Sequence, residues 1–243
     1  MKYSVIIPIC NEEDSLLPLY NSLKDIMNTL NEQYEILFVD DGSTDSSLKQ
    51  LRRVFMDSKS MAIVILKERV GKAEALQAGF DNAVGEIYIT LDGDGQDDPR
   101  EIPSLLNKMD EGYDVVYGWR RRRQDPFITK IASKTANMIR RLMTKEKIHD
   151  VGCAMRVFRK KGIEHVCLSK GLHRFFSAIM VKLGYCIGEV EVVHYPRETG
   201  ISKYGIWDRL VEGTIDSIRF CFLDTQTLMS HKRKYRIKEI LRK

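Results

Sequence analysis

The sequence predicts an α/β fold in which a mostly parallel sheet is covered by helices on both faces. Strand-like and helix-like segments alternate through the first half of the 243 residues, which is the pattern of repeated strand–helix–strand units. The strand-like segments, such as residues 36–39, are nearly unbroken apolar runs, as expected for strands with both faces buried. Hydrophobic residues make up 43% of the chain, which is enough for a sizeable core.

The expected strands span residues 3–9, 35–39, 61–66, 86–91 and 114–117, and the helices between them span residues 15–30, 44–56, 72–83 and 100–109. Polar residues 43–45 and the pair Asp98 and Pro99 supply helix starts. Two further segments, 127–144 and 206–222, carry apolar residues at helical spacing, and the first of them has a basic opposite face. Each is expected either to lie in the interface of an anionic membrane or to pack onto the sheet, because both arrangements produce this pattern.

The net charge of +5 is concentrated at the C-terminal end, where residues 231–243 hold seven Lys and Arg side chains against the single acid Glu239. Such a cluster is typical of contact with an anionic membrane or a nucleic acid, and a solvated helix is the alternative. The five cysteines are scattered, and no secretory leader is expected ahead of the first strand, which indicates a reduced cytosolic environment. No apolar run approaches the ~18–20 residues that span a bilayer.

Acidic and amide side chains follow three of the expected strands. Ligands bind at the carboxyl ends of the strands in open α/β sheets, and an Asp-x-Asp pair there can hold Mg²⁺ or Mn²⁺ through oxygen. One acidic turn is an ordinary turn, but three at one sheet edge indicate a nucleotide site. The residues concerned are Asn11, Glu12 and Glu13, then Asp40 and Asp41, then Asp92 and Asp94.

Four motifs together resemble the GT-A fold of family 2 glycosyltransferases, a Rossmann-like nucleotide-sugar-binding fold. They are VIIPICNEE at 5–13, VDDGSTD at 39–45, GKAEAL at 71–76 and LDGDGQDDP at 91–99. The QDDP ending, with DVGCAMR at 150–156 and RETGISKY at 197–204, is similar to polyprenyl-phosphate sugar transferases, the group that contains dolichol-phosphate mannose synthases. Gly95 departs from that group, which more often has an apolar residue there, and the membrane-spanning helices that follow in many bacterial members are not expected in this chain.

The resemblance implies a catalytic domain over residues 1–205, with a nucleotide-sugar half at 1–118 and an acceptor half at 119–205. Residues 206–243 would form an amphipathic and basic C-terminal helical extension. The implied nucleotide-sugar-binding residues are Pro8, Asn11, Glu12, Asp40, Asp41, Lys72, Asp92, Arg197, Ser202 and Lys203. The implied ligands of Mg²⁺ or Mn²⁺ are Asp92, Asp94 and Gln96. The implied catalytic residues are Asp150 and Asp94, and those for the acceptor phosphate are Arg120, Arg121, Lys130, Ser133 and Lys134.

The implied reaction is the metal-dependent, inverting transfer of a mannose- or glucose-like hexose from a GDP- or UDP-sugar to a dolichyl or undecaprenyl phosphate. The enzyme would work peripherally on the cytoplasmic face of a membrane, alone or with a small anchoring subunit, and without nucleic acid. One alternative acceptor is a sugar hydroxyl of a lipid-linked glycan or surface polysaccharide, for which Asp150 would be an obligatory base. A second alternative is a binding protein in which the basic helices act and the acidic motifs are relics.

Overall fold

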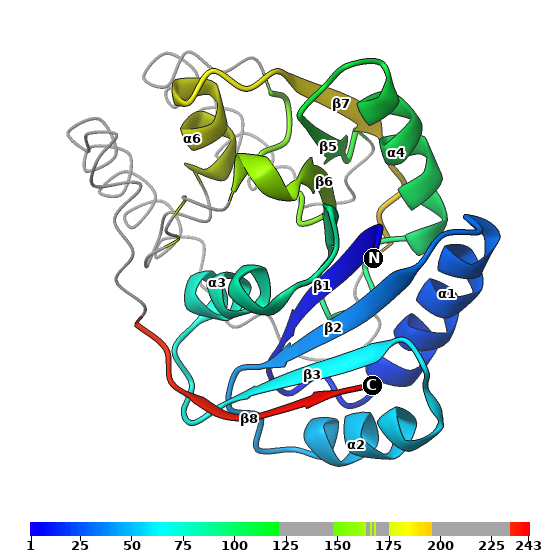
Figure 1. Ribbon diagram of the computed structural model, residues 1–243, viewed down its shortest axis with the longest axis vertical. Coiled ribbons are helices and arrows are strands. Elements are labelled where there is room, and N and C mark those ends of the chain that lie inside the picture. Colours follow the sequence, from blue (N-terminus) through cyan, green and yellow to red (C-terminus); the bar gives the residue numbers. More distant parts are fainter. Residues whose placement is uncertain (122–147, 164–165, 167, 169–174, 196–233) are drawn as a thin grey trace.

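The computed structural model describes residues 1–121, 148–163, 166, 168, 175–195 and 234–243. Figure 1 shows a twisted sheet with α1, α2 and α4 against one face and α3 and α6 against the other. The strands are β1 Tyr3–Ile9, β2 Tyr34–Asp40, β3 Met61–Leu66, β4 Ile87–Thr90, β5 Val115–Trp119, β6 Arg156–Arg159, β7 Ile187–Glu191 and β8 Ile237–Arg242. The helices are α1 Leu16–Thr29, α2 Ser47–Asp57, α3 Lys72–Asn82, α4 Ile102–Asp110 and α6 Phe176–Lys182, with 3-10 turns at η1 Pro99–Glu101 and η2 Lys160–Gly162.

The described strands form one sheet in the order β7-β5-β6-β4-β1-β2-β3-β8. Strands β4, β1, β2 and β3 run parallel to one another, and β5 runs parallel to β7, whereas β6 is antiparallel to both β4 and β5, and β8 is antiparallel to β3. The expected mostly parallel sheet with helices on both faces is therefore confirmed. The carboxyl ends of β1 to β4 meet at one edge, as the parallel register requires.

The central strands are buried on both faces, as the unbroken apolar runs predict. Ile6 and Leu37 pack in a cluster with α3 and α6, whereas Val5 and Phe38 pack in a second cluster with α1, α2 and α4. All four side chains have no solvent exposure. At about 25 cal/mol per Å² of apolar surface, this double burial is the main favourable term that holds β1 and β2 at the centre of the sheet.

The helix starts follow the two expected polar segments with one shift. Asp98 accepts a hydrogen bond from Arg100 N at 3.0 Å, and Pro99 opens η1, as expected. The second helix begins at Ser47, three residues later than expected. Thr44 N donates to the side-chain oxygen of Asn11 at 2.7 Å, so this backbone group is used in a loop contact.

The C-terminal end corrects the expectation of a helical extension that runs to residue 243. Residues 237–242 form β8, which pairs with the edge of β3 and is marked in red in Figure 1. The physical reason is the open hydrogen-bonding edge of β3, which a strand satisfies and a helix does not. Arg242 also reaches the buried carboxylate of Glu35 at 2.6 Å. The expected helices at 127–144 and 206–222 lie outside the described residues, and no helix that the structure does describe is long and apolar enough to cross a bilayer.

Candidate active site at the carboxyl ends of the strands

The loop after β1 is held to the loop after β2 by a set of side-chain to backbone hydrogen bonds. Asn11, whose φ of 57° lies in the left-handed region, accepts from Thr44 N, and its own N–H donates to Ser43 Oγ at 3.1 Å. Glu12 N donates to Ser47 Oγ at 2.9 Å. An asparagine tolerates this backbone conformation better than most residues do, which explains structurally why residue 11 is an asparagine. These bonds place both acidic motifs on one rigid surface.

The two adjacent aspartates after β2 have different environments. Both oxygens of Asp41 are bonded to backbone, to Val70 N at 2.7 Å and Gly71 N at 2.9 Å, so this carboxylate fixes the loop after β3. Asp40 is 2% exposed, and burial raises its pKa even though hydrogen bonds from Ser43 oppose the shift. Asp41 is therefore held on both oxygens by the loop after β3, whereas Asp40 accepts from Ser43 N of its own loop at 3.2 Å.

Lys72, the first residue of α3, connects the loop after β3 to the Asp-x-Asp motif. Its ammonium lies 2.5 Å from Asp92, and Ser15 Oγ in turn donates to Gly93 O at 2.6 Å, which ties the motif back to the loop after β1. Burial opposes ionisation of Asp92, but the charge and hydrogen bond of Lys72 outweigh it and hold the pKa of Asp92 below its ordinary value. All four loops at the carboxyl ends of β1 to β4 are thus cross-linked around Asp92.

An apolar-floored pocket opens beside Asp92. Lys72, Asp92 and Arg156 line it together with the aromatic rings of Phe80 and Phe176. The Arg156 guanidinium is held by the carbonyl oxygens of residues 151 and 153 and lies 4.9 Å from the centre of the Tyr117 ring. Two fixed cations therefore flank one carboxylate, an arrangement suited to a diphosphate. Arg156 is not among the site residues expected from the sequence, although it lies in the DVGCAMR motif at 150–156.

The expected metal ligands are neighbours on one loop. Gly95, with φ of 73°, turns the chain between Asp94 and Gln96, and Asp94 Oδ1 accepts from Gln96 N at 3.2 Å. Gln96 donates its side-chain N–H to Tyr195 O at 3.1 Å, and its backbone oxygen accepts from Tyr195 N at 3.0 Å. No three Asp, Glu, His or Cys side chains of the described residues could hold a metal by themselves. The donor set nevertheless fits Mg²⁺ or Mn²⁺, since such sites use one or two carboxylates and fill the remaining positions with substrate phosphates and water.

Arg120 and Asp150 form a buried ion pair. Arg120 Nε and Nη2 lie 2.6 and 3.0 Å from the two oxygens of Asp150, and the side chains are 10% and 7% exposed. The carboxylate also accepts from Arg120 N at 3.3 Å and Gly152 N at 3.2 Å. Burial lowers the pKa of the Arg120 guanidinium, but the hydrogen bond and charge of Asp150 outweigh it and raise the pKa. Two residues expected to act separately, as phosphate ligand and as base, are bound to each other.

An aromatic stack lies next to this ion pair. The rings of Trp119 and His149 are 4.3 Å apart, and Arg121 lies 5.6 Å from the centre of the Trp119 ring while pairing with Glu191 at 2.7 Å. Arg121 stays 63% exposed and so is the more accessible of the two expected arginines. The remaining expected site residues, Lys130, Ser133, Lys134, Arg197, Ser202 and Lys203, lie outside the described residues. Pro8 lies in β1, directly before the loop that carries Asn11.

Comparison with known proteins gives a family and a fold. The family model for glycosyl transferase family 2 matches residues 4–167. The dodecaprenyl-phosphate galacturonate synthase of Rhizobium johnstonii (strain DSM 114642 / LMG 32736 / 3841) is 38% identical over 211 residues, which cover 85% of this chain and 62% of the relative. The undecaprenyl-phosphate 4-deoxy-4-formamido-L-arabinose transferase of Klebsiella pneumoniae (strain 342) is 38% identical over 204 residues, 84% of this chain and 62% of the relative. The chain thus spans about three fifths of the length of these relatives.

Solved structures share the fold at low sequence identity. Glucosyl-3-phosphoglycerate synthase from Mycobacterium tuberculosis, in complex with Mn²⁺, UDP-glucose and phosphoglyceric acid, superposes with a TM-score of 0.69 at 18% identity and covers 92% of this chain and 80% of its own. Residues 1–349 of S. aureus TarS in complex with UDP-GlcNAc give a TM-score of 0.62 at 18% identity, over 93% of this chain and 69% of that one. The GT-A-like α/β fold is therefore confirmed.

Proposed function

Because the chain belongs to glycosyl transferase family 2, we propose that it transfers a sugar from a nucleoside diphosphate sugar to a polyprenyl phosphate. The names of the two relatives described above contain dodecaprenyl phosphate and undecaprenyl phosphate, and this acceptor class is the one we carry over to the chain. The cross-linked loops around Asp92 and the flanking cations Lys72 and Arg156 support the nucleoside diphosphate as the leaving group.

The engagement of Asp150 is the observation that favours a phosphate acceptor over a sugar hydroxyl. A hydroxyl must lose a proton as it attacks, so its transferase needs a base with an available lone pair. The Asp150 carboxylate instead accepts four hydrogen bonds, three of them from Arg120, in a buried ion pair. A lipid phosphate is already anionic near neutral pH, since the second pKa of a phosphate monoester is about 6. It needs no base.

The proposed step is a direct displacement with inversion. An oxygen of the lipid phosphate forms a bond to the anomeric carbon as the bond from that carbon to the diphosphate oxygen breaks, and the electron pair leaves with the nucleoside diphosphate. Lys72 and Arg156 would bind the negative charge that grows on the leaving group, because fixed cations beside a shielded pocket stabilise such charge without reorganising. Arg121, largely exposed beside Trp119, would bind the incoming phosphate.

A divalent cation is part of this proposal. Asp94, with Asp92 and the side-chain oxygen of Gln96, would hold Mg²⁺ or Mn²⁺, the oxygen-ligand ions that these side chains suit. When bound, the ion supplies Lewis-acid neutralisation of the departing diphosphate. Lys72 would keep Asp92 ionised and in place until the ion and the nucleotide arrive.

The proposed class of transferred sugars is broader than the mannose- or glucose-like hexose expected from the sequence. The relatives are named for galacturonate and for 4-deoxy-4-formamido-L-arabinose. The proposed donor is therefore a nucleoside diphosphate sugar of either class, with UDP- and GDP-sugars as the candidates to test.

The test is to incubate the purified chain with Mn²⁺ or Mg²⁺, a panel of radiolabelled nucleotide sugars and polyprenyl phosphate in detergent. Acid-labile label in the organic phase that disappears with EDTA supports the proposal and identifies the donor. A parallel incubation replaces polyprenyl phosphate with a lipid-linked glycan or polysaccharide acceptor. Label that enters only this second acceptor would contradict the phosphate acceptor and support the hydroxyl alternative.

We expect Asp94→Ala to abolish transfer in this assay while the free energy of unfolding changes by less than about 1 kcal/mol, because Asp94 lies on a surface loop outside the core. The matched control is Asp25→Ala, which removes an exposed carboxylate from α1 and should leave turnover unchanged. Wild-type turnover in Asp94→Ala would exclude Asp94 as a ligand or catalytic group.

A further inference from the structure

Some cations of the C-terminal segment contact the rest of the protein, and others are exposed to solvent. Arg242 pairs with Glu35, whose side chain is 4% exposed, and the Lys243 ammonium lies 5.1 Å from the centre of the Phe55 ring, so both hold β8 against the sheet. Lys234, Arg236 and Lys238 are exposed. No hydrogen bond or ion pair of their side chains is found among the described residues.

The antiparallel pairing places the start of β8 at the carboxyl end of β3. Leu66 is opposite Ile237, and Lys67 N donates to Arg236 O at 2.9 Å. Lys67 and Arg69, which follow β3, are also exposed. These five side chains, Lys67, Arg69, Lys234, Arg236 and Lys238, form what we call the basic edge. Two acids lie beside them: Glu68, which is exposed, and Glu239, which pairs with Arg52.

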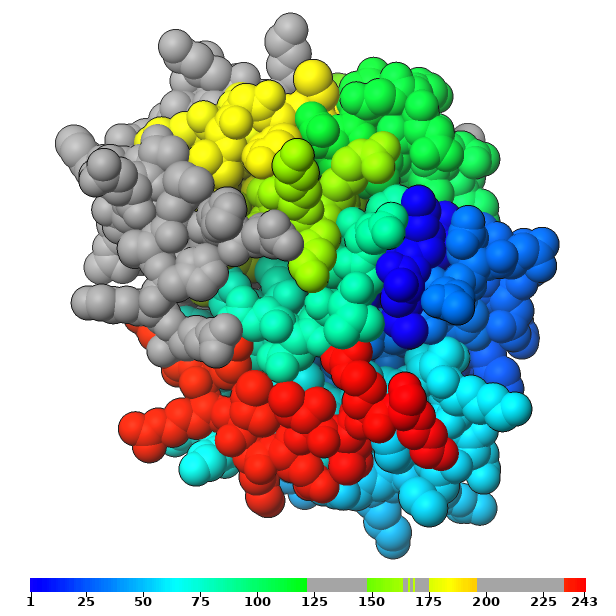
Figure 2. Space-filling view, viewed as in Figure 1, coloured from blue at the N-terminus to red at the C-terminus, as the bar shows by residue number. Residues whose placement is uncertain are grey.

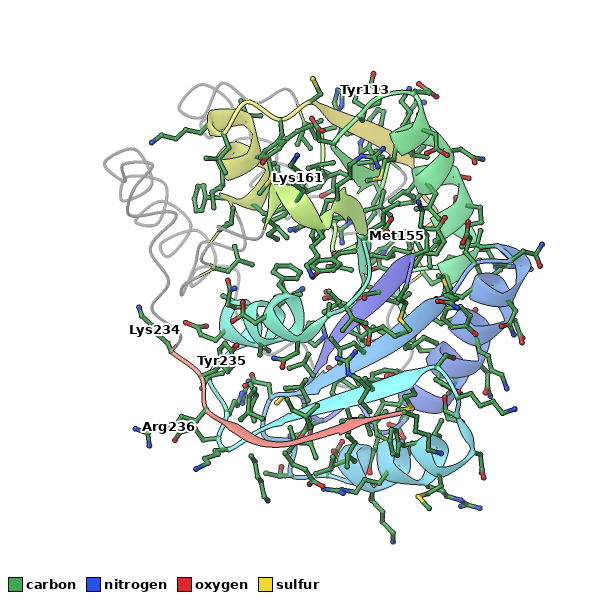
Figure 3. All side chains as sticks on the ribbon, in the orientation of Figure 1. Tyr113, Met155, Lys161, Lys234, Tyr235 and Arg236 are labelled. Carbon is green, nitrogen blue, oxygen red and sulfur yellow. The ribbon has the colours of Figure 1, made fainter. Side chains whose placement is uncertain are left out.

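Side chains alternate between buried and exposed in the segment that leads into β8, which keeps Lys234 and Arg236 of the basic edge turned to solvent. Tyr235, 8% exposed, points inward and donates its hydroxyl to Asp81 of α3 at 2.6 Å. Its neighbours Lys234 and Arg236 lie on the outside of the molecule in Figure 3. Lys238 is the extra residue of a bulge, because Ile65 is opposite Glu239 and Leu66 is opposite Ile237. Figure 2 shows this segment as a continuous red band on the surface.

The basic edge is joined rigidly to the candidate active site. A Cβ atom on Gly42, where φ is 67°, would lie 2.8 Å from Arg69 N, so the loop after β2 packs directly on the basic edge. Asp41 binds the N–H groups of Val70 and Gly71, the residues between Arg69 and Lys72. The basic edge and the acidic motifs therefore share one edge of the sheet and keep a fixed mutual orientation.

We propose that the basic edge is a docking surface for the anionic lipid headgroups of a membrane, and that it turns the active-site edge of the sheet toward the bilayer. Five exposed cations outnumber the exposed Glu68 and the Arg52-paired Glu239, so the basic edge is complementary to an anionic surface. Each Lys or Arg near such a surface contributes about 1 kcal/mol, a factor of about five in affinity. The proposal rests on the proposed function only in that a membrane-embedded acceptor gives the orientation its purpose. The binding itself requires no catalysis.

The test is co-sedimentation of the full chain with phosphatidylcholine vesicles that contain or lack about 30% phosphatidylglycerol. The variant Lys234→Glu/Arg236→Glu should bind the anionic vesicles at least about 30-fold more weakly than the wild type. The matched control, Lys24→Glu/Lys59→Glu, makes the same charge change on exposed residues away from the basic edge. Lys24 lies in α1, and Lys59 lies in the turn before β3, at the opposite end of β3 from the basic edge. This control should bind the anionic vesicles as the wild type does. Both variants should show the thermal unfolding of the wild type, because the substituted side chains are exposed.

Binding to the anionic vesicles should also weaken steeply as NaCl rises from about 0.05 to 0.5 M. Equal loss of binding in both double variants, or wild-type binding in Lys234→Glu/Arg236→Glu, would overturn the proposal. Equal binding to vesicles without phosphatidylglycerol would overturn it as well. Transfer to a short, water-soluble prenyl phosphate separates this inference from the proposed function. The basic-edge variant should retain that transfer, whereas failure of transfer in the wild type with intact vesicle binding would contradict the proposed function alone.

Discussion

Removal of one partner from the Arg120–Asp150 pair should destabilise the protein far more than a surface substitution would. Asp150→Ala leaves the guanidinium of Arg120, 10% exposed, without the two hydrogen bonds of 2.6 and 3.0 Å that now satisfy it. An uncompensated buried charge costs about 3–5 kcal/mol. For a chain of this size, that corresponds to a fall in melting temperature of roughly 6–20 °C. Asp150→Asn keeps one acceptor oxygen and should lose about 1.5–3 kcal/mol.

The assay is urea unfolding of the two single variants and of the double variant Arg120→Met/Asp150→Ala, followed by transfer activity per folded molecule. The double variant should be more stable than the sum of the two single losses implies, with a coupling of at least about 2 kcal/mol, because no charge is left unpaired. Asp150→Asn should retain measurable transfer, since the proposed acceptor needs no base. An Asp150→Ala stability within about 0.5 kcal/mol of the wild type, or additive single losses, would refute the structural reasoning. Near-complete loss of transfer in well-folded Asp150→Asn would favour the hydroxyl acceptor.

Two further predictions concern the scaffold. Burial acts to raise the pKa of Asp98, but the hydrogen bonds and charge of Arg100 hold that pKa below its ordinary value. The stability that ionised Asp98 contributes is present above the ordinary pKa of about 3.9 and is lost as the pH falls through the lower folded-state pKa. Asp98→Asn should therefore lose about 0.5–1 kcal/mol less free energy of unfolding on acidification than the wild type does. The control Asp57→Asn, at an exposed carboxylate, should show the acid dependence of the wild type. In α3, a Cβ on Gly79 would overlap a methyl group of Ile6, so Gly79→Ala should cost about 1–3 kcal/mol in chemical denaturation; Gly162→Ala, where the nearest atoms are 3.5 Å away, should change stability by less than Gly79→Ala does.

The first half of the fold could be predicted from the sequence because each strand carries enough information by itself. Strands β1 and β3 have the expected bounds, and β2, β4 and β5 differ from them by no more than two residues. These strands are buried on both faces, so their apolar runs need no knowledge of the partner strand. The later strands escaped prediction for the opposite reason. Strand β6 is four residues long with arginine at each end, and β8 has an exposed side, so their β structure depends on the neighbour that each one pairs with.

The acidic motifs could be placed at one sheet edge from the sequence, because parallel strands end together and the loops that follow them must meet. The contacts that each of those side chains makes could not be predicted from the sequence. Which of Asp40 and Asp41 holds the loop after β3 depends on which of them meets the N–H groups of Val70 and Gly71, a contact between segments about 30 residues apart in the chain. The pairing of Arg120 with Asp150 is likewise a contact between distant segments.

The sequence by itself determined the succession of strands and helices in the first half of the chain, the end of the sheet that carries the acidic motifs and the residue types available there, because periodicity and turn composition are local properties of the chain. Only the tertiary structure decided which carboxylates accept hydrogen bonds from backbone N–H groups, which arginine lies in a buried ion pair and which C-terminal cations are exposed to solvent. Charge and hydrogen-bonding capacity belong to a residue, but their use depends on distances of 3 to 4 Å between segments far apart in the chain. Those distances are fixed when the strands take their register.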